Sequence, residues 1–385
     1  MTGAAVFWEY GKYATAAIFL VALLRHRRRR PSGAMLLYFA LLVPSTALTV
    51  AALDLSAARS AISFNLSGPF VLAVSAWFFL QLTLSGTQVA RLLTTTMAPI
   101  VAVSVVVLFG IVTKESLRFG RESSLVTSGD FGPNQVSAVL GLGSLLAFFC
   151  AQDVALGRMV RAVMLAFCLV FAAQSALTFS RGGLYLAAGG ALAAVFYLAR
   201  EARARVRAVG IVVLCFFVAA YLVLPWLDSF TGGAISLRFA DTGVTHRDEI
   251  ARSDLQIWME YPVLGVGPGL SRSHRESLIR GIAHTEFSRL LAEHGILGLA
   301  ALILLLASGA RNVRRQRSAP AKAVVAATVV WSFLFMAAAA MRLVAPSFLF
   351  AAGFANTLSR SPRLLRRGLR NGGRLIAVGR PLVGQ

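Results

Sequence analysis

The feature that most constrains the fold of this chain is a succession of about eleven apolar stretches, each near the roughly 20 residues that a helix needs to cross a bilayer core. They lie near 5–24, 34–53, 68–84, 93–112, 135–151, 162–179, 183–199, 208–225, 294–310, 323–341 and 343–358. Because 57% of the residues are hydrophobic and only 14% are charged, a water-soluble fold is excluded. The sequence predicts an all-α polytopic membrane protein with about 11 transmembrane helices, or a related twelve-helix arrangement.

Arginine-rich segments between these stretches predict the orientation of the chain. They are residues 25–30, Arg91, Arg158, Arg161, 200–207, 311–322 and the tail from Arg360 onward. With the amino terminus outside, every one of these clusters faces the cytoplasm, as basic loops generally do. The net charge of +22 then lies at the cytoplasmic face, against anionic headgroups. Membrane topology therefore explains the basic composition, and no nucleic-acid partner is expected.

The distribution of charge also divides the chain into four regions. Residues 1–225 hold eight membrane helices with short loops, and 226–293 form a large, charged, helical loop outside the membrane. Residues 294–358 hold three further helices, and 359–385 are a basic cytoplasmic tail.

The outer loop carries its own helix signals. Thr245 and Asp248 resemble a capping box at the start of a helix, which Pro262 and Gly265 end. A second helix is expected from near Ala283 into the ninth span.

Two arginines near the outer membrane surface are candidate anion-binding residues. Arg181 stands between two apolar stretches with almost no loop, and Arg247 lies in the first turn of the predicted loop helix. A guanidinium suits a diphosphate, because its planar fork donates paired hydrogen bonds and keeps its charge. Two simpler interpretations remain open. Arg181 could be an interfacial residue that reaches toward the headgroups, and Arg247 could pair with Asp248 or Glu249.

His284 is a candidate general base, because an imidazole can accept a proton from a hydroxyl near neutral pH. Glu286 or Glu293 could orient it, although a histidine at this position could also simply cap a helix. No cofactor or metal is expected. No sequence with metal-ligand spacing is present, the glycine-rich run 265–269 lacks the dinucleotide-binding pattern, and all three cysteines lie in apolar runs.

Several of these motifs occur together in one order. Ser180-Arg181-Gly182 is followed by Arg247, by Pro-Val-Leu-Gly-Val-Gly-Pro-Gly at 262–269, and by Ala283-His284 with Leu-Leu-Ala-Glu-His-Gly-Ile-Leu-Gly at 290–298. Gly132-Pro133-Asn134 precedes them. The set resembles the bacterial O-antigen ligase and O-antigen polymerase (Wzy-type) superfamily of integral-membrane glycosyltransferases. The resemblance covers roughly residues 129–298.

The resemblance implies an inverting, metal-independent transferase in the bacterial cytoplasmic membrane, with its site on the outer side. The donor would be an oligosaccharide on undecaprenyl diphosphate or a similar polyprenyl carrier, and the acceptor a hydroxyl of a glycan, lipid or protein. Arg181 and Arg247 would neutralise the diphosphate, and His284 would assist the acceptor. Further candidates for contact with the diphosphate or the acceptor are Arg238, Asn134, Glu286 and Arg289.

A transporter of a small anion or of a lipid-linked sugar is the alternative class. Against it, the apolar stretches carry almost no charge at mid-depth and few helix-breaking residues, whereas transporters usually carry both polar sites and broken helices. Within the transferase class, the sequence does not separate ligase from polymerase, since fold resemblance does not fix the acceptor.

Overall fold

The fold was obtained as a computed structural model. It describes residues 3–25, 31–113, 123, 125–153, 156–198, 202–240, 247–275 and 285–357. Nearly all of its regular structure is helical. The helices are α1 (Gly3–Leu24), α2 (Gly33–Leu42), α3 (Thr46–Ala52), α4 (Leu55–Leu80), α5 (Gly86–Val112), α6 (Pro133–Gln152), α7 (Arg158–Leu177), α8 (Gly182–Leu198), α9 (Ala202–Val218), α10 (Leu224–Phe230), α11 (Ala234–Ala240), α12 (Arg247–Glu260), α13 (Glu286–Arg315), α14 (Ala319–Ala339) and α15 (Val344–Ala352).

Shorter elements complete the described chain. Two 3-10 turns lie at Val126–Ser128 and Ser271–His274, and a π-helical turn, Ala219–Val223, joins α9 to α10. The strands β1 (Thr83–Leu84) and β2 (Asn356–Thr357) form one short parallel pair.

Eight helical segments among the described residues are long and apolar enough to cross a membrane. They are Gly33–Ala52, Leu55–Leu80, Gly86–Val112, Pro133–Gln152, Arg158–Leu177, Arg205–Phe230, Glu286–Arg315 and Ala319–Ala339. The chain is thus a multi-pass membrane protein. The sequence prediction of about eleven spans exceeds this number by α1, by α8, which has 17 residues, and by the last stretch.

The prediction of a membrane-spanning helix at 343–358 is wrong, because the helix found there is too short to cross a membrane. This stretch folds as the nine-residue helix α15, followed by a turn and by β2. Asn356 then donates its backbone N–H to the carbonyl oxygen of Leu82, which aligns β2 with β1. The apolar composition of α15 reflects burial inside the protein, because Leu349, Phe350 and Ala351 are buried there.

Two predicted boundaries of the outer loop also shift. The eighth span continues to Phe230, past the expected end at residue 225, and α13 begins at Glu286, before the expected start of the ninth span at 294. The tail from 359 onward lies outside the described residues. Helix α12 matches its predicted range, with Asp248 in its first turn, while Thr245 falls outside the described part.

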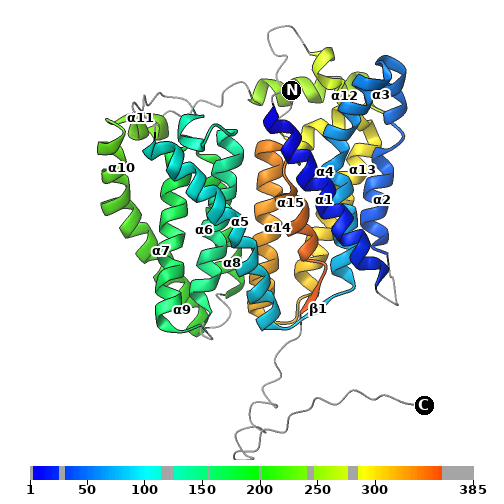
Figure 1. Ribbon diagram of the computed structural model, residues 1–385. Coiled ribbons are helices and arrows are strands. Elements are labelled where there is room, and N and C mark those ends of the chain that lie inside the picture. Colours follow the sequence, from blue (N-terminus) through cyan, green and yellow to red (C-terminus); the bar gives the residue numbers. More distant parts are fainter. Residues whose placement is uncertain are drawn as a thin grey trace, which may run out of the picture.

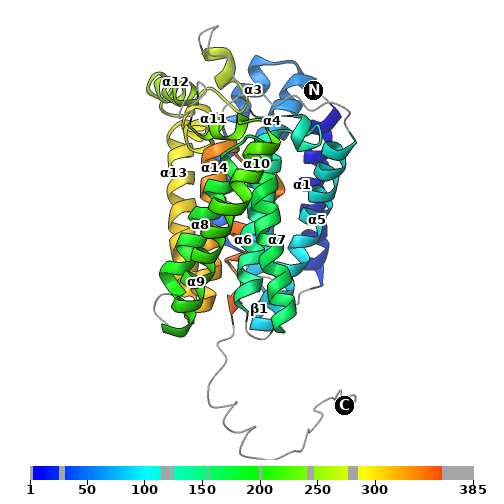
Figure 2. The same cartoon turned by 90° about the vertical axis from the view of Figure 1, so that its left-hand side faces the viewer.

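The helices form two groups that meet at α14 (Figure 1). Helices α6, α7 and α8 pack together in one group, while α1, α2, α4, α13 and α15 pack together in the other. Helix α14 contacts α8 and α6 on one side and α13 and α15 on the other. Figure 2 shows α3, α11 and α12 at one end of the bundle and α9 and β1 at the opposite end.

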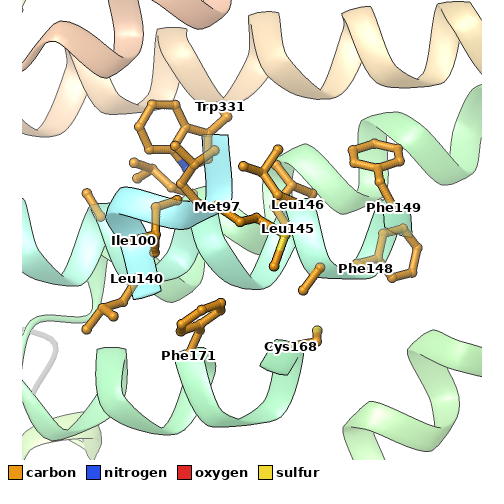
Figure 3. Close-up of a cluster of buried hydrophobic side chains, with 14 of the residues drawn as sticks. Met97, Ile100, Leu140, Leu145, Leu146, Phe148, Phe149, Cys168, Phe171 and Trp331 are labelled. Carbon is orange, nitrogen blue, oxygen red and sulfur yellow. The ribbon is translucent and has the colours of Figure 1, made fainter. Parts of the chain in front are cut away.

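Close packing between helices is clearest around α6 (Figure 3), where α5, α7 and α14 converge on it. Trp331 of α14 and Phe171 of α7 are fully buried. Gly143 of α6 leaves space for Ile100 and Phe171, since a Cβ at this position would lie 2.7 Å from Ile100 and 2.8 Å from Phe171. Small residues at such positions let membrane helices approach closely. The group that carries Arg181 is therefore rigidly packed.

Candidate functional site

The turn between α7 and α8 holds Arg181 in a fixed place. Phe179, two residues earlier, is fully buried and has a backbone φ of +56°, which is rare for a residue other than glycine. The next residue, Ser180, donates its hydroxyl to Asn134 Oδ1 at 2.8 Å, and its carbonyl oxygen accepts from Ser137 Oγ at 2.7 Å. The predicted site residue Asn134 therefore lies beside the Arg181 turn, attached to the residue that precedes the arginine.

The start of α8 is packed directly against α6. The Ser137 hydroxyl accepts the N–H of Gly183 at 3.1 Å, and a Cβ at Gly183 would collide with the carbonyl oxygen of Ser137. A Cβ at Gly141 would in turn collide with the carbonyl oxygen of Gly183. The glycine at 183 is thus required by backbone contact, whereas a Cβ at Gly182 would lie no closer than 3.7 Å to any neighbouring atom.

Two further arginines come to the same end of the bundle from other elements. Arg238 of α11 donates from Nε to the carbonyl oxygen of Phe179 at 3.1 Å, which places α11 on the Arg181 turn. Burial, and then the positive charges of Arg238 and Arg181, lower the pKa of the Arg247 guanidinium at the start of α12. Arg238 and Arg181 thus lie close enough to Arg247 for their charges to act on it, and we call these three residues the arginine cluster.

Asp254 of α12 makes a buried ion pair with Arg275, after the 3-10 turn, and a hydrogen bond with α13, neither of which the sequence predicted. Arg275 binds Asp254 of α12 through both Nε and Nη2, and both side chains are fully buried. The other carboxylate oxygen of Asp254 accepts from Ser288 Oγ of α13 at 2.7 Å. The position of Arg247, at the first residue of α12, therefore depends on this pair.

The structure places the predicted residues Glu286 and Arg289 in a buried network on α13. Arg289 binds Glu286 at 2.5 Å and Glu293 at 2.7 Å, and donates to Asn65 of α4. Glu286 also accepts the backbone N–H of Met341 at 3.2 Å. These groups join α4, α13 and the turn after α14, so their visible contacts are with the protein itself.

Two of the predicted motifs contact each other at a break in α13. Gly295 has φ +60° and ψ −137°, so the helix that the sequence predicted as continuous is interrupted there. The carbonyl oxygens of Ala292 and Glu293, which lose their helical partners at the break, accept the N–H groups of Val266 and Gly267 at 3.0 Å each. The glycine-rich loop therefore serves as backbone support for α13, and needs no nucleotide to explain its composition.

The histidines fall into two sets. His294 is fully buried, with Nδ1 2.5 Å from Ser45 Oγ of the α2–α3 turn, as a structural residue would be. The catalytic candidate His284, like His246, lies outside the described residues. Its chain neighbour Thr285 caps α13 by accepting the N–H of Phe287 at 3.2 Å.

One functional candidate was missed in the sequence. Arg342, between α14 and α15, lies within electrostatic reach of Arg247, Arg289 and Glu286. It carries the same signal as Arg181, a charge between two apolar stretches with almost no loop.

A cavity lies away from the arginine cluster, near the end of the bundle that carries β1. It measures about 300 Å³ and is lined mainly by apolar side chains, including Phe19, Phe78, Phe79 and Phe348. It does not include Arg181, Arg238 or Arg247.

Together, the fold and the arginine cluster define a multi-pass helical membrane protein with a candidate anion-binding site at one end of its bundle. Residues 162–303 match the family model described as O-antigen ligase, so the chain contains an O-antigen ligase family domain. The match includes Arg181, Arg238, Arg247, His284, Glu286 and Arg289, whereas Asn134 and Arg342 lie outside it. No curated protein gives a significant match to the chain.

Proposed function

We propose that the chain transfers a glycan from a polyprenyl diphosphate, such as undecaprenyl diphosphate, to an acceptor hydroxyl on the outer side of the cytoplasmic membrane. The observation that carries this proposal is the convergence of Arg181, Arg238 and Arg247 from three separate elements. Guanidinium groups held near one another at a membrane surface favour an anionic ligand. Membership of the matched domain in the O-antigen ligase family supports a lipid-linked glycan as that ligand.

The chemistry follows from the leaving group. The acceptor oxygen attacks the anomeric carbon, and the bond from that carbon to the diphosphate oxygen breaks with its electron pair retained by the diphosphate. The negative charge on the leaving group grows as this bond breaks, so fixed cations stabilise the transition state more than the ground state. Direct displacement inverts the configuration at the anomeric carbon.

In this proposal the three arginines and His284 have separate tasks. Arg181 and Arg247 bind the diphosphate, and Arg238 holds the Arg181 turn while adding positive charge. His284, as general base, accepts the proton of the acceptor hydroxyl, a step typically worth about 10²–10⁴-fold in rate. No metal is required, since the arginines supply the positive charge.

Glu286, Arg289 and Asn134 act as positioning residues in this scheme. Glu286 and Arg289 hold the outer part of α13 against α4, directly after the segment that carries His284. Asn134 fixes Ser180, and through it the Arg181 turn. We propose a positioning role for these residues in place of direct contact with the substrate, because the hydrogen bonds described for their side chains are made to the protein.

The distribution of charge supports an outer site. Arg158, Arg203 and Arg311 belong to the helix ends opposite Arg181, at the end of the bundle that carries α9 and β1 (Figure 1). Basic helix ends face the cytoplasm. The arginine cluster then faces outward, where lipid-linked glycans are transferred to their acceptors in the resembled family.

The decisive experiment deletes the gene in the source organism and analyses its lipids by mass spectrometry. A transferase predicts that a polyprenyl-diphosphate-linked glycan accumulates while a surface glycan is lost, and that the wild-type gene reverses both changes. Complementation with Arg181→Ala should fail, whereas Arg252→Ala, an exposed arginine of α12, should restore both. Unchanged lipid-linked glycan in the deletion strain would overturn the proposal and favour the transporter class.

A further inference from the structure

The turn between α14 and α15 repeats the construction of the Arg181 turn. Ala340 has a φ of +52°, close to the +56° of Phe179, and each of these residues precedes an arginine by two positions. A positive φ in a residue with a Cβ is strained, and such strain persists where the surrounding structure enforces it. The Arg181 turn belongs to the group of α6, α7 and α8, whereas the Arg342 turn connects α14 to α15 of the other group.

The surroundings of the second turn are as tight as those of the first. The absence of a side chain at Gly68 of α4 lets the turn pack against this helix, since a Cβ there would lie 2.5 Å from the carbonyl oxygen of Met341. Ser347 donates to the carbonyl oxygen of Gly68 at 2.9 Å, and the buried carboxylate of Glu286 accepts the N–H of Met341. The residues on both sides of Arg342 are thus fixed by contacts with α4 and with Glu286.

The Arg342 guanidinium is also supported by an aromatic ring. Its Cζ lies 5.8 Å from the ring centroid of Phe64 on α4, and Lys12 Nζ of α1 lies 6.0 Å from the same centroid. A cation at this distance from an aromatic ring is attracted by the ring's charge distribution. Lys12 is neutralised by Glu9 at 2.6 Å and donates to Ser67 at 2.8 Å, so Lys12 is engaged in fastening α1 to α4.

The charges of Arg342 and of one member of the arginine cluster, Arg247, act on each other. Arg342 and Arg247 are within electrostatic reach of each other, and Arg247 is within reach of Arg181. Glu286 is also within electrostatic reach of Arg342, and it is bound by Arg289 at 2.5 Å. Repulsion between Arg342 and Arg247 is relieved when an anion lies between them.

We propose that Arg342 is a further binding residue for the diphosphate of the lipid-linked donor, on the side opposite Arg181. The proposal rests on the proposed function. In it, Phe64 orients the guanidinium plane, and the strained Ala340 turn fixes its position. The diphosphate is then held between the α7–α8 and α14–α15 turns, one from each helix group.

The test measures binding of undecaprenyl diphosphate, without a sugar, to the purified full-length chain in lipid nanodiscs. We expect Arg342→Ala to weaken binding at least tenfold. Arg342→Gln should weaken binding as much as Arg342→Ala does, and Arg342→Lys should have an intermediate effect. Phe64→Leu keeps the arginine and similar volume, so a loss of about threefold is expected from misorientation alone. Arg59→Ala, at an exposed arginine of the same helix as Phe64, is the matched control.

The outcomes separate this inference from the proposed function. Weaker binding in the Arg342 variants, with binding of undecaprenol and the melting temperature unchanged, supports the inference. If Arg181→Ala and Arg247→Ala lose binding but Arg342→Gln and Arg342→Lys do not, the inference is overturned and the proposed function stands. If the wild-type chain does not bind the diphosphate, both fail. Should Arg342→Ala not fold, Arg342→Lys and Phe64→Leu decide.

Discussion

Arg238 donates from its Nε to the carbonyl oxygen of Phe179 at 3.1 Å, across 59 positions of sequence. Phe179 is the strained, fully buried residue that sets the Arg181 turn, so this hydrogen bond couples the outer loop to the membrane bundle. The positive charge of Arg238 also acts on Arg247 and helps to lower the pKa of the Arg247 guanidinium. One arginine therefore both positions a neighbouring arginine and adds to the charge that an anion would encounter.

The first prediction concerns the paired arginines. Arg181→Ala and Arg247→Ala should each lower the rate of glycan transfer by about 10²–10³-fold, the usual cost of removing one fixed donor that stabilises transition-state charge. Arg247→Lys should also be slow, because a point charge cannot reproduce the paired donors of a guanidinium. The measurement is release of polyprenyl diphosphate from a lipid-linked glycan in membranes that contain each variant.

The control for this prediction is Arg252→Ala, which removes an exposed arginine one turn further along α12. It should leave the rate within twofold of wild type. If Arg181→Ala and Arg247→Ala both kept the wild-type rate, the anion site would have to lie elsewhere in the chain.

The second prediction uses two adjacent glycines. Gly183→Ala should destabilise the protein by about 1–3 kcal/mol, as overpacking does, since its Cβ would collide with the Ser137 carbonyl oxygen. Relieving this collision would move the start of α8 away from α6 and displace the Arg181 turn, so donor binding should weaken. Gly182→Ala, where the nearest atom is 3.7 Å away, should be tolerated. Thermal unfolding in detergent and undecaprenyl diphosphate binding check both, and equal behaviour of the two variants would refute the packing argument.

The third prediction concerns the attachment of α12. Asp254→Asn removes the carboxylate charge from a fully buried pair with Arg275, and breaking such a pair costs about 3–5 kcal/mol. We expect a lower melting temperature, faster proteolysis near α12, and weaker diphosphate binding because Arg247 is displaced. Glu260→Gln, an exposed carboxylate at the end of the same helix, is the matched control and should change none of these. Normal binding in a destabilised Asp254→Asn variant would show that Arg247 is positioned independently.

The sequence predicted the parts of this molecule that depend on local pattern. Helix α12 begins and ends close to its expected capping and proline signals, and ten of the predicted stretches lie on helices of 17 residues or more, α2 and α3 being counted as one segment. Arg181 was identifiable because placing a charge between two membrane-spanning stretches is energetically unfavourable, so that such residues are often functional. Arg342 carries the same signal and was missed, since the run that follows it was interpreted as a further span.

The relationships that required the structure are those between distant segments. Hydropathy does not distinguish a helix buried in protein from one facing lipid, so α15 could not be separated from a true span. The pairing of Arg275 with Asp254, and the contact of the glycine-rich loop with the break at Gly295, depend on tertiary packing. A single sequence contains no local signal that joins these positions.

The fourth prediction tests His284 through the pH dependence of transfer. A general base works in its neutral form, so the rate should be highest above the ordinary histidine pKa of about 6.5 and fall about tenfold per pH unit well below it. His284→Gln should lower the rate by about 10²–10⁴-fold and abolish that acidic limb, while binding of undecaprenyl diphosphate remains because the arginines are intact. His274→Gln is the control, because His274 Nδ1 donates to the carbonyl oxygen of Leu270 at 3.0 Å and His274 is not part of the arginine cluster. Rate profiles of all three proteins from pH 5 to 8 decide the matter, and an unchanged acidic limb in His284→Gln would assign the titrating group to another residue.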